Sequence, residues 1–85
     1  MLLHKYYNRI VLNPKILVGK PVIKGTRISV ELILKLLAQG MQINEILEEY
    51  PRLNRQDILA AMDYAYDIVE NEEVHLLRLA RVWNF

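Results

Sequence analysis

Few residues of this chain have side chains suited to covalent catalysis. The sequence contains no cysteine, and the hydroxyl groups that fall in or beside a recognisable motif belong to Thr26 and Ser29. The two histidines, His4 and His75, lie near opposite ends of the sequence. A catalytic nucleophile needs a neighbouring base and a third group that orients this base. We therefore expect a protein that is not an enzyme and that requires no cofactor.

Three carboxylates recur along one predicted helix. Asp63, Asp67 and Glu70 are spaced i, i+4 and i+7, a spacing that places them on one helix face. Oxygen ligands of this kind bind divalent cations in proteins. A solvated helix surface explains the same spacing more simply, and we expect no metal site.

Basic side chains are concentrated in the first third of the chain. Residues 1–30 contain six Lys or Arg and no acidic residue, whereas residues 31–73 contain ten acidic and three basic residues. A basic arm joined to an acidic body indicates an anionic partner, pairing between arm and body, or both. Solvation of the cations, or their pairing within the chain, accounts for the pattern equally well.

The segment Gly19–Ile28, with the sequence GKPVIKGTRI, displays three of these cations on a backbone that cannot be helical. Its glycines and its proline impose a defined bent path. Lys20, Lys24 and Arg27 are our first candidates for contacts with DNA phosphates, and such contacts make binding strongly salt-dependent. The alternative is that these cations only flank a structural hairpin that leads into a helix.

We expect short extended segments to form the backbone of this basic arm. Residues 9–12 are short, β-branched and followed by an Asn-Pro turn signal, so we predict a strand there. Residues 22–23 and 26–28 are two further extended pieces that could pair with it or with a second copy. An isolated hairpin is marginally stable, so this sheet needs helical cover or a second protomer.

Three helices follow, and local signals define their ends. The first begins at the N-cap Ser29 and ends at Gly40. The second spans about 43–49 and ends before a proline. The third begins at the N-cap Asn54, with Asp57 three residues further on. We predict a mainly α domain, a three-helix helix-turn-helix core with a short N-terminal β arm and a C-terminal helical tail.

The start of the third helix is a second candidate for DNA contact. In a helix-turn-helix the N-terminal part of the last helix enters the major groove. Arg52, Arg55 and Gln56 are residue types that read guanine or adenine edges. Against this, Asn54 is needed as a cap, and the acidic residues further along would repel phosphates. The arm and the third helix therefore both remain candidates.

The chain is unusually apolar for its size. Hydrophobic residues make up 53% of its 85 residues, above the usual content of about 45–50%, and a chain this short buries only about 60–65% of its unfolded surface. No disulfide compensates for the small size, since there is no cysteine. We expect a second copy to cover part of this apolar surface, which predicts a homodimer.

The length predicts one domain, comprising residues 1–70 with the basic arm at 1–28, followed by an amphipathic tail at 71–85. No apolar stretch approaches the roughly 18 residues of a membrane span, and the first residues lack the order of a signal peptide. We expect a cytoplasmic protein that does not enter membranes.

The tail has the composition of an interface. Trp and Arg are common anchors of protein–protein contacts, and we expect residues 74–85 to dock as an amphipathic helix in the groove of a partner. The alternative is that the tail folds over its own core or over a sister protomer. The candidate partner-binding residues are Leu77, Arg78, Arg81, Trp83 and Phe85.

Several separated segments resemble one known family in their order and spacing. They are GKPVIKGTRI at 19–28, VELIL at 30–34, EILEEYP at 45–51, and the pairs Asp57-Ile58 and Ala60-Ala61. Together they are similar to a small prokaryotic family catalogued as domain of unknown function four-thirty-three. The resemblance covers roughly residues 10–65, about two thirds of the chain. At 42–44 the chain has Gln-Ile-Asn where the family commonly has Ser/Thr-Pro-Glu, so we expect a weaker cap on the second helix.

This resemblance implies a homeodomain-like helix-turn-helix, and members are often described as VapB-type antitoxins encoded beside a toxin that resembles PIN-domain ribonucleases. It therefore implies the antitoxin of a type II toxin–antitoxin pair, which neutralises its toxin by direct binding and binds operator DNA. Arg78 or Arg81 would then pair with the acidic metal-binding site of the toxin. The alternatives are a stand-alone transcriptional regulator with the same fold and a purely structural dimerisation module.

Overall fold

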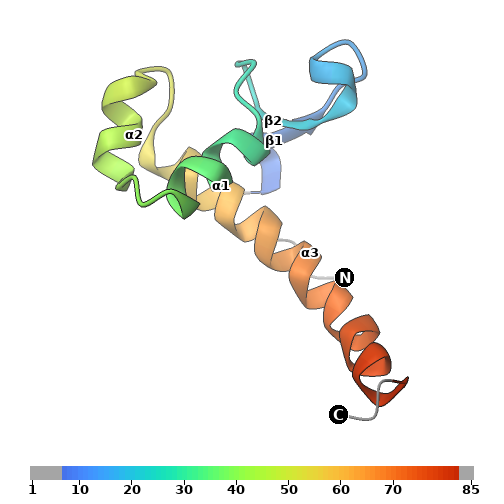
Figure 1. Cartoon of the computed structure of the whole chain (residues 1–85). Helices are drawn as coiled ribbons and strands as arrows, with labels where there is room; N and C mark the ends of the chain where they lie inside the picture. The colour runs from blue at the N-terminus through green and yellow to red at the C-terminus, as the bar shows by residue number, and fades with distance from the viewer. Residues whose placement is uncertain (1–6, 83–85) are drawn as a thin grey trace.

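The computed structural model describes residues 7–82, and within them the side chains of residues 8–71. It contains a small β arm followed by three helices (Figure 1). The elements are a 3₁₀ turn η1 (Tyr7–Arg9), strand β1 (Ile10–Leu12), a second turn η2 (Leu17–Gly19), strand β2 (Pro21–Ile23), and helices α1 (Val30–Ala38), α2 (Ile43–Glu49) and α3 (Arg55–Val82). The predicted fold class, a mainly α three-helix core with an N-terminal β arm, is confirmed.

The two strands pair antiparallel, with Ile10 opposite Ile23 and Val11 opposite Val22. Val22 and Ile23 are buried, because β2 lies against α1. The third extended piece folds back on β2, where the Ile23 N–H donates to the Ile28 carbonyl at 2.9 Å. The helical cover that the sequence demands for this sheet is therefore supplied by α1 of the same chain.

The ends of α1 are those predicted from its capping residues. The Ser29 hydroxyl accepts a hydrogen bond from the backbone N–H three residues later. At the other end, the Gly40 N–H donates to the Leu37 carbonyl at 3.0 Å and the Met41 N–H donates to the Leu36 carbonyl at 3.1 Å. This pair of bonds is a Schellman motif, and it requires the positive φ of 95° that Gly40 adopts.

The hydrophobic core lies where the three helices meet β2. Its central side chains are isoleucines from each of these elements, which are all less than 3% exposed. Loss of water contact by aliphatic side chains of this size is the main stabilising contribution to the fold. The buried cluster comprises Ile23, Val30, Ile33, Ile46, Leu53, Ile58 and Ala61.

The helix α2 is capped in spite of its unusual first residues. The Gln42 N–H donates to the Glu45 carboxylate at 2.7 Å, which is half of a capping box. The loss of the common Ser/Thr-Pro-Glu start is therefore partly compensated. Residues 50–54 then connect α2 to α3, forming the predicted helix-turn-helix corner.

The helix α3 is longer than the apolar pattern indicates. It continues without a break across residue 70, where the sequence predicts the change from domain to tail. Neither Gly nor Pro occurs between residues 52 and 82, and the run at 70–73 is rich in Glu, a good helix former. With 28 residues, α3 is about 42 Å long, and its second half runs past α1 and α2 (Figure 1).

Within residues 7–82, no helix combines the length and the hydropathy that a membrane-spanning segment requires.

Candidate nucleic-acid interface

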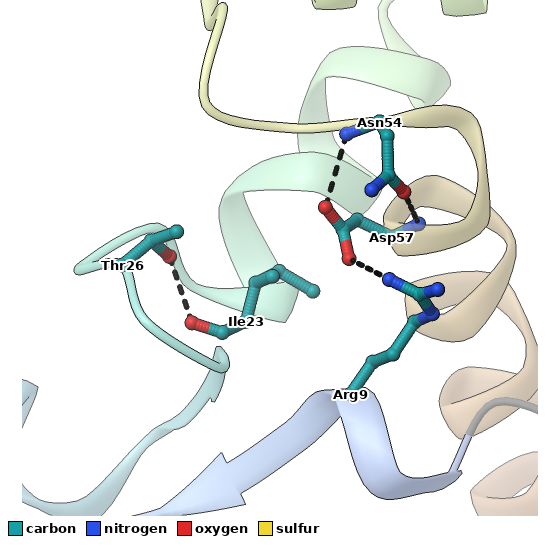
Figure 2. Close-up of polar contacts among 5 residues, drawn as sticks. All are labelled: Arg9, Ile23, Thr26, Asn54 and Asp57. Carbon is teal, nitrogen blue, oxygen red and sulfur yellow. Dashed lines mark hydrogen bonds and ion pairs between the residues drawn. The ribbon is translucent and has the colours of Figure 1, made fainter.

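A tight turn between β2 and α1 fixes the backbone of the basic motif. The Thr26 N–H donates to the Ile23 carbonyl at 3.0 Å, and Gly25 has a φ of 81°, as the third position of a type II turn requires. The Thr26 hydroxyl also donates to the Ile23 carbonyl at 2.8 Å and accepts from the Ile28 N–H at 2.9 Å. This hydroxyl therefore locks the turn that carries Lys24 and Arg27 (Figure 2).

The turn and the helix-turn-helix corner border one hollow. Its volume is about 440 Å³. Two of the sequence-predicted DNA-contact residues, Arg27 and Arg52, lie in its wall although they are far apart in the sequence. Neither forms an ion pair with any residue whose side chain the structure describes. The lining residues are Ile16, Gly25, Thr26, Arg27, Ile28 and Arg52.

Two guanidinium groups beside one hollow are suited to an anion. Arginine is always charged, and its planar fork of N–H donors matches the oxygens of phosphate. With no acidic partner among the described side chains, both groups are available to an external ligand. The chemistry of the hollow therefore suits a bound anion such as phosphate, and its lining residues include no nucleophile–base pair.

The remaining predicted DNA-contact residues fall into two groups. Lys24, in the turn, and Arg55 and Gln56, in the first turn of α3, are exposed and close in sequence to residues that line the hollow. They do not line it themselves. Lys20 instead pairs with Glu31 of α1, with Nζ to Oε1 at 2.8 Å. The hydrogen bond from Lys20, and then its charge, lower the pKa of the exposed Glu31 carboxyl.

A second ion pair joins the arm to the start of α3 (Figure 2). The Arg9 guanidinium lies 3.1 Å from Oδ1 of Asp57, which is only 5% exposed. The other oxygen of Asp57 accepts the Asn54 N–H, and the Asn54 side chain accepts the Asp57 N–H, each at 3.0 Å. The predicted N-cap at Asn54 is confirmed, so its amide oxygen is occupied. Pairing between arm and body thus accounts for two of the arm cations.

The structure says less about the metal-binding possibility and about the predicted partner-binding residues of the tail. Among the described residues, no group of three or more His, Cys, Asp or Glu side chains could hold a metal ion. Leu77, Arg78 and Arg81 belong to the α3 backbone, but their side chains lie outside the described residues. Trp83 and Phe85 also lie outside them.

A second hollow, which sequence reasoning missed, lies between α1, β2 and α3. It has a volume of about 320 Å³ and an almost entirely apolar wall. Ile68 and Val69 of α3 stand beside it, 44% and 59% exposed. The high apolar content of the chain was the signal for such a surface, although it gave no position. The lining residues are Pro21, Val30, Glu31, Leu34, Tyr64, Ala65, Ile68 and Val69.

Residues 10–65 match the family model described as protein of unknown function (DUF433). The chain belongs to the DUF433 family. The resemblance seen in the sequence is thereby confirmed. Every residue that lines the Arg27–Arg52 hollow falls within the DUF433 match, whereas the second half of α3 lies beyond it.

The fold is also similar to that of a solved DUF433 member. The crystal structure of a DUF433 protein from Anabaena variabilis matches with a TM-score of 0.70 and 30% sequence identity, over 82% of this chain and 69% of that chain. No curated protein matches the sequence.

Proposed function

We propose that this protein is a DNA-binding antitoxin of the type II class, which binds operator DNA and neutralises a PIN-like ribonuclease by direct contact. The observation that carries the DNA-binding part is the placement of Arg27 and Arg52 in one hollow at the helix-turn-helix corner, with no acidic partner among the described side chains. A binding function, and no catalysis, is proposed for this site.

Phosphate contact by the hollow has a quantitative consequence. The slope of log affinity against log salt is negative, and each phosphate contact that is lost reduces its steepness by about 0.9. We expect Arg27→Gln and Arg52→Gln each to weaken binding to a duplex taken from upstream of the gene and each to reduce this slope. Fluorescence anisotropy at several salt concentrations measures both quantities.

The matched control is Lys35→Gln, which removes one exposed positive charge from α1, away from the hollow. It should weaken binding less than either arginine variant. If all three substitutions weaken DNA binding equally, only the net charge of the protein matters, and the hollow is not the DNA-binding site.

The proposed contact with the toxin is supported by the length of α3. Its second half is helical to Val82 and extends past α1 and α2. A projecting helix of this kind fits the groove of a partner protein. We expect the product of the adjacent reading frame to co-purify with this protein, and Arg78→Glu with Arg81→Glu to weaken the complex.

The stand-alone regulator is the second candidate, because the hollow alone supports it equally well. Loss of DNA binding in the arginine variants without any co-purifying neighbour would favour this function. If the protein binds neither DNA nor the neighbour, the structural dimerisation module remains.

A further inference from the structure

The tip of the β arm, residues 13–20 between the two strands, has an unusual backbone. Leu17, Val18 and Gly19 have successive φ values of 50°, 57° and 78°, which form a short left-handed turn. Hydrogen bonds from the Gly19 N–H to the Ile16 carbonyl and from the Lys20 N–H to the Leu17 carbonyl close it, at 3.1 and 3.2 Å. Left-handed geometry is unfavourable for any residue with a Cβ, and a β-branched residue such as valine is a genuine outlier there.

The strain at Val18 is not offset by burial. Its side chain is 94% exposed, so it gains almost nothing from the core of its own chain. Leu12 and Leu17, on either side of the tip, are also 62% and 38% exposed. Glycine or asparagine would satisfy the same backbone at lower cost. An apolar side chain held in an unfavourable conformation and in water indicates a contact outside the monomer.

The position of the tip identifies the partner. Ile16, within the tip, lines the same hollow as Arg27 and Arg52. In Figure 1 the tip, the turn before α1 and the connection between α2 and α3 all lie at the upper side of the molecule, while α3 leads away from them. Lys15 in the tip is exposed, and no acidic residue occurs in residues 1–30. A polyanion that covers the hollow would therefore meet the tip as well.

Resting on the DNA-binding function proposed above, we propose that the tip is an apolar wedge that inserts Val18 into the minor groove, while Arg27 and Arg52 hold the flanking phosphates. Proteins that bind the minor groove frequently insert apolar side chains between base steps and kink the duplex by roughly 20–90°. The two hydrogen bonds that close the turn hold Val18 exposed before DNA arrives, so little ordering is needed on binding. The wedge carries no charge, so its contribution does not depend on salt.

The decisive variant is Val18→Gly, which removes the wedge and relieves the strain together. We expect its melting temperature to rise while its affinity for DNA falls severalfold, with the salt slope unchanged. Val18→Ile is the matched control, because it keeps both the strain and the apolar side chain, and it should bind as the parent protein does. Val18→Asn, which tolerates the left-handed region, provides a second wedge-free variant should the glycine variant fold poorly.

The probe is a duplex from upstream of the gene with a fluorophore at each end. Energy transfer between the ends should rise when the parent protein or Val18→Ile binds, and should remain at the free-DNA value with Val18→Gly or Val18→Asn. If Val18→Gly and Val18→Asn bind and bend the DNA as the parent protein does, the wedge is overturned and the proposed arginine site still stands. If Arg27→Gln and Arg52→Gln also bind DNA as the parent protein does, the wedge and the proposed DNA-binding site are both overturned. A wedge-free variant that binds normally but sediments as a smaller species would show that the tip joins protein copies instead.

Discussion

At the scale of single residues, Asp57 has the most constrained surroundings. Both of its carboxylate oxygens are occupied, one by the Arg9 guanidinium and the other by the Asn54 N–H. Asp57 is buried, whereas the Arg9 side chain remains 37% exposed. The two partners therefore differ in what their removal leaves behind. Without Arg9 a buried charge is unpaired, while without Asp57 the arginine can still reach water.

We predict that Arg9→Met destabilises the protein by about 2 kcal/mol, less than the 3–5 kcal/mol of a fully buried pair because Arg9 is partly exposed. Asp57→Asn keeps an oxygen for the Asn54 N–H and removes the charge. The double variant Arg9→Met, Asp57→Asn should therefore be more stable than Arg9→Met alone. Urea unfolding of the three variants and the parent measures the difference. A double variant whose loss equals the sum of the single losses would contradict the coupling.

The surface pair of Lys20 and Glu31 predicts a small pH dependence. Lys20 lowers the pKa of the Glu31 carboxyl in the folded state. A carboxyl whose folded pKa is lowered contributes stability above its usual pKa, and loses this contribution as pH falls through the lowered value. We expect Lys20→Met to raise the pKa of Glu31 in an NMR titration. Lys35→Met should raise it less, because Lys35 is the smaller cause. An unchanged Glu31 titration in Lys20→Met would show that the ion pair does not form in solution.

The residues that sequence reasoning located correctly are those whose partners are local. Asn54 and Asp57 are three positions apart, so their mutual capping was predictable. Arg9 lies 48 positions from Asp57, and nothing in the sequence couples them. The left-handed conformation of Val18 was equally hidden, because valine carries no signal for it.

At the scale of elements, the turn before α1 determines where Arg27 lies. One hydroxyl, that of Thr26, makes both of its side-chain hydrogen bonds within this turn. The Thr26 side chain is half-buried and also lines the hollow beside Arg27. The turn is therefore the link between the β arm and the proposed phosphate site.

We predict that Thr26→Val, which preserves the shape of the side chain, destabilises the fold by about 1–2 kcal/mol because the Ile28 N–H loses its acceptor. It should also weaken DNA binding, since Arg27 is no longer held beside Arg52. Thr26→Ser restores the hydroxyl and should recover both properties. Thermal unfolding and anisotropy provide the two measurements. Unchanged DNA binding in Thr26→Val would show that this turn does not position Arg27.

Helix ends were predicted well where capping residues mark them, as at Ser29 and Gly40. The far end of α3 was not, because helices are extended by residues of good propensity even where the apolar pattern fades. The Glu-rich run at 70–73 is such a segment. The hollow between Arg27 and Arg52 also required the structure, because it depends on how the β arm packs against the helix-turn-helix corner.

At the scale of the whole molecule, the shape is extended for a chain of this size. The radius of gyration is 15.0 Å, against about 12 Å for a compact domain of the same length. The accessible surface is 6743 Å², against about 5,200 Å² for a compact monomer of the same mass. Much of the exposed apolar surface lies on α3, where Met62, Tyr66 and Val69 are spaced i, i+4 and i+7 and are 42%, 59% and 59% exposed.

This spacing is that of one side of a two-helix contact, which supports the homodimer expected from composition. We predict that the protein sediments as a dimer at micromolar concentration. Val69→Glu, which places a charge in the apolar stripe, should shift it to a species of 10.0 kDa, the mass of one chain. Asn71→Glu adds the same charge at an exposed position outside the stripe and should leave the dimer unchanged. A parent protein that sediments as a single chain would contradict the prediction, and the exposed stripe on α3 would then be open to a different partner, such as the proposed toxin.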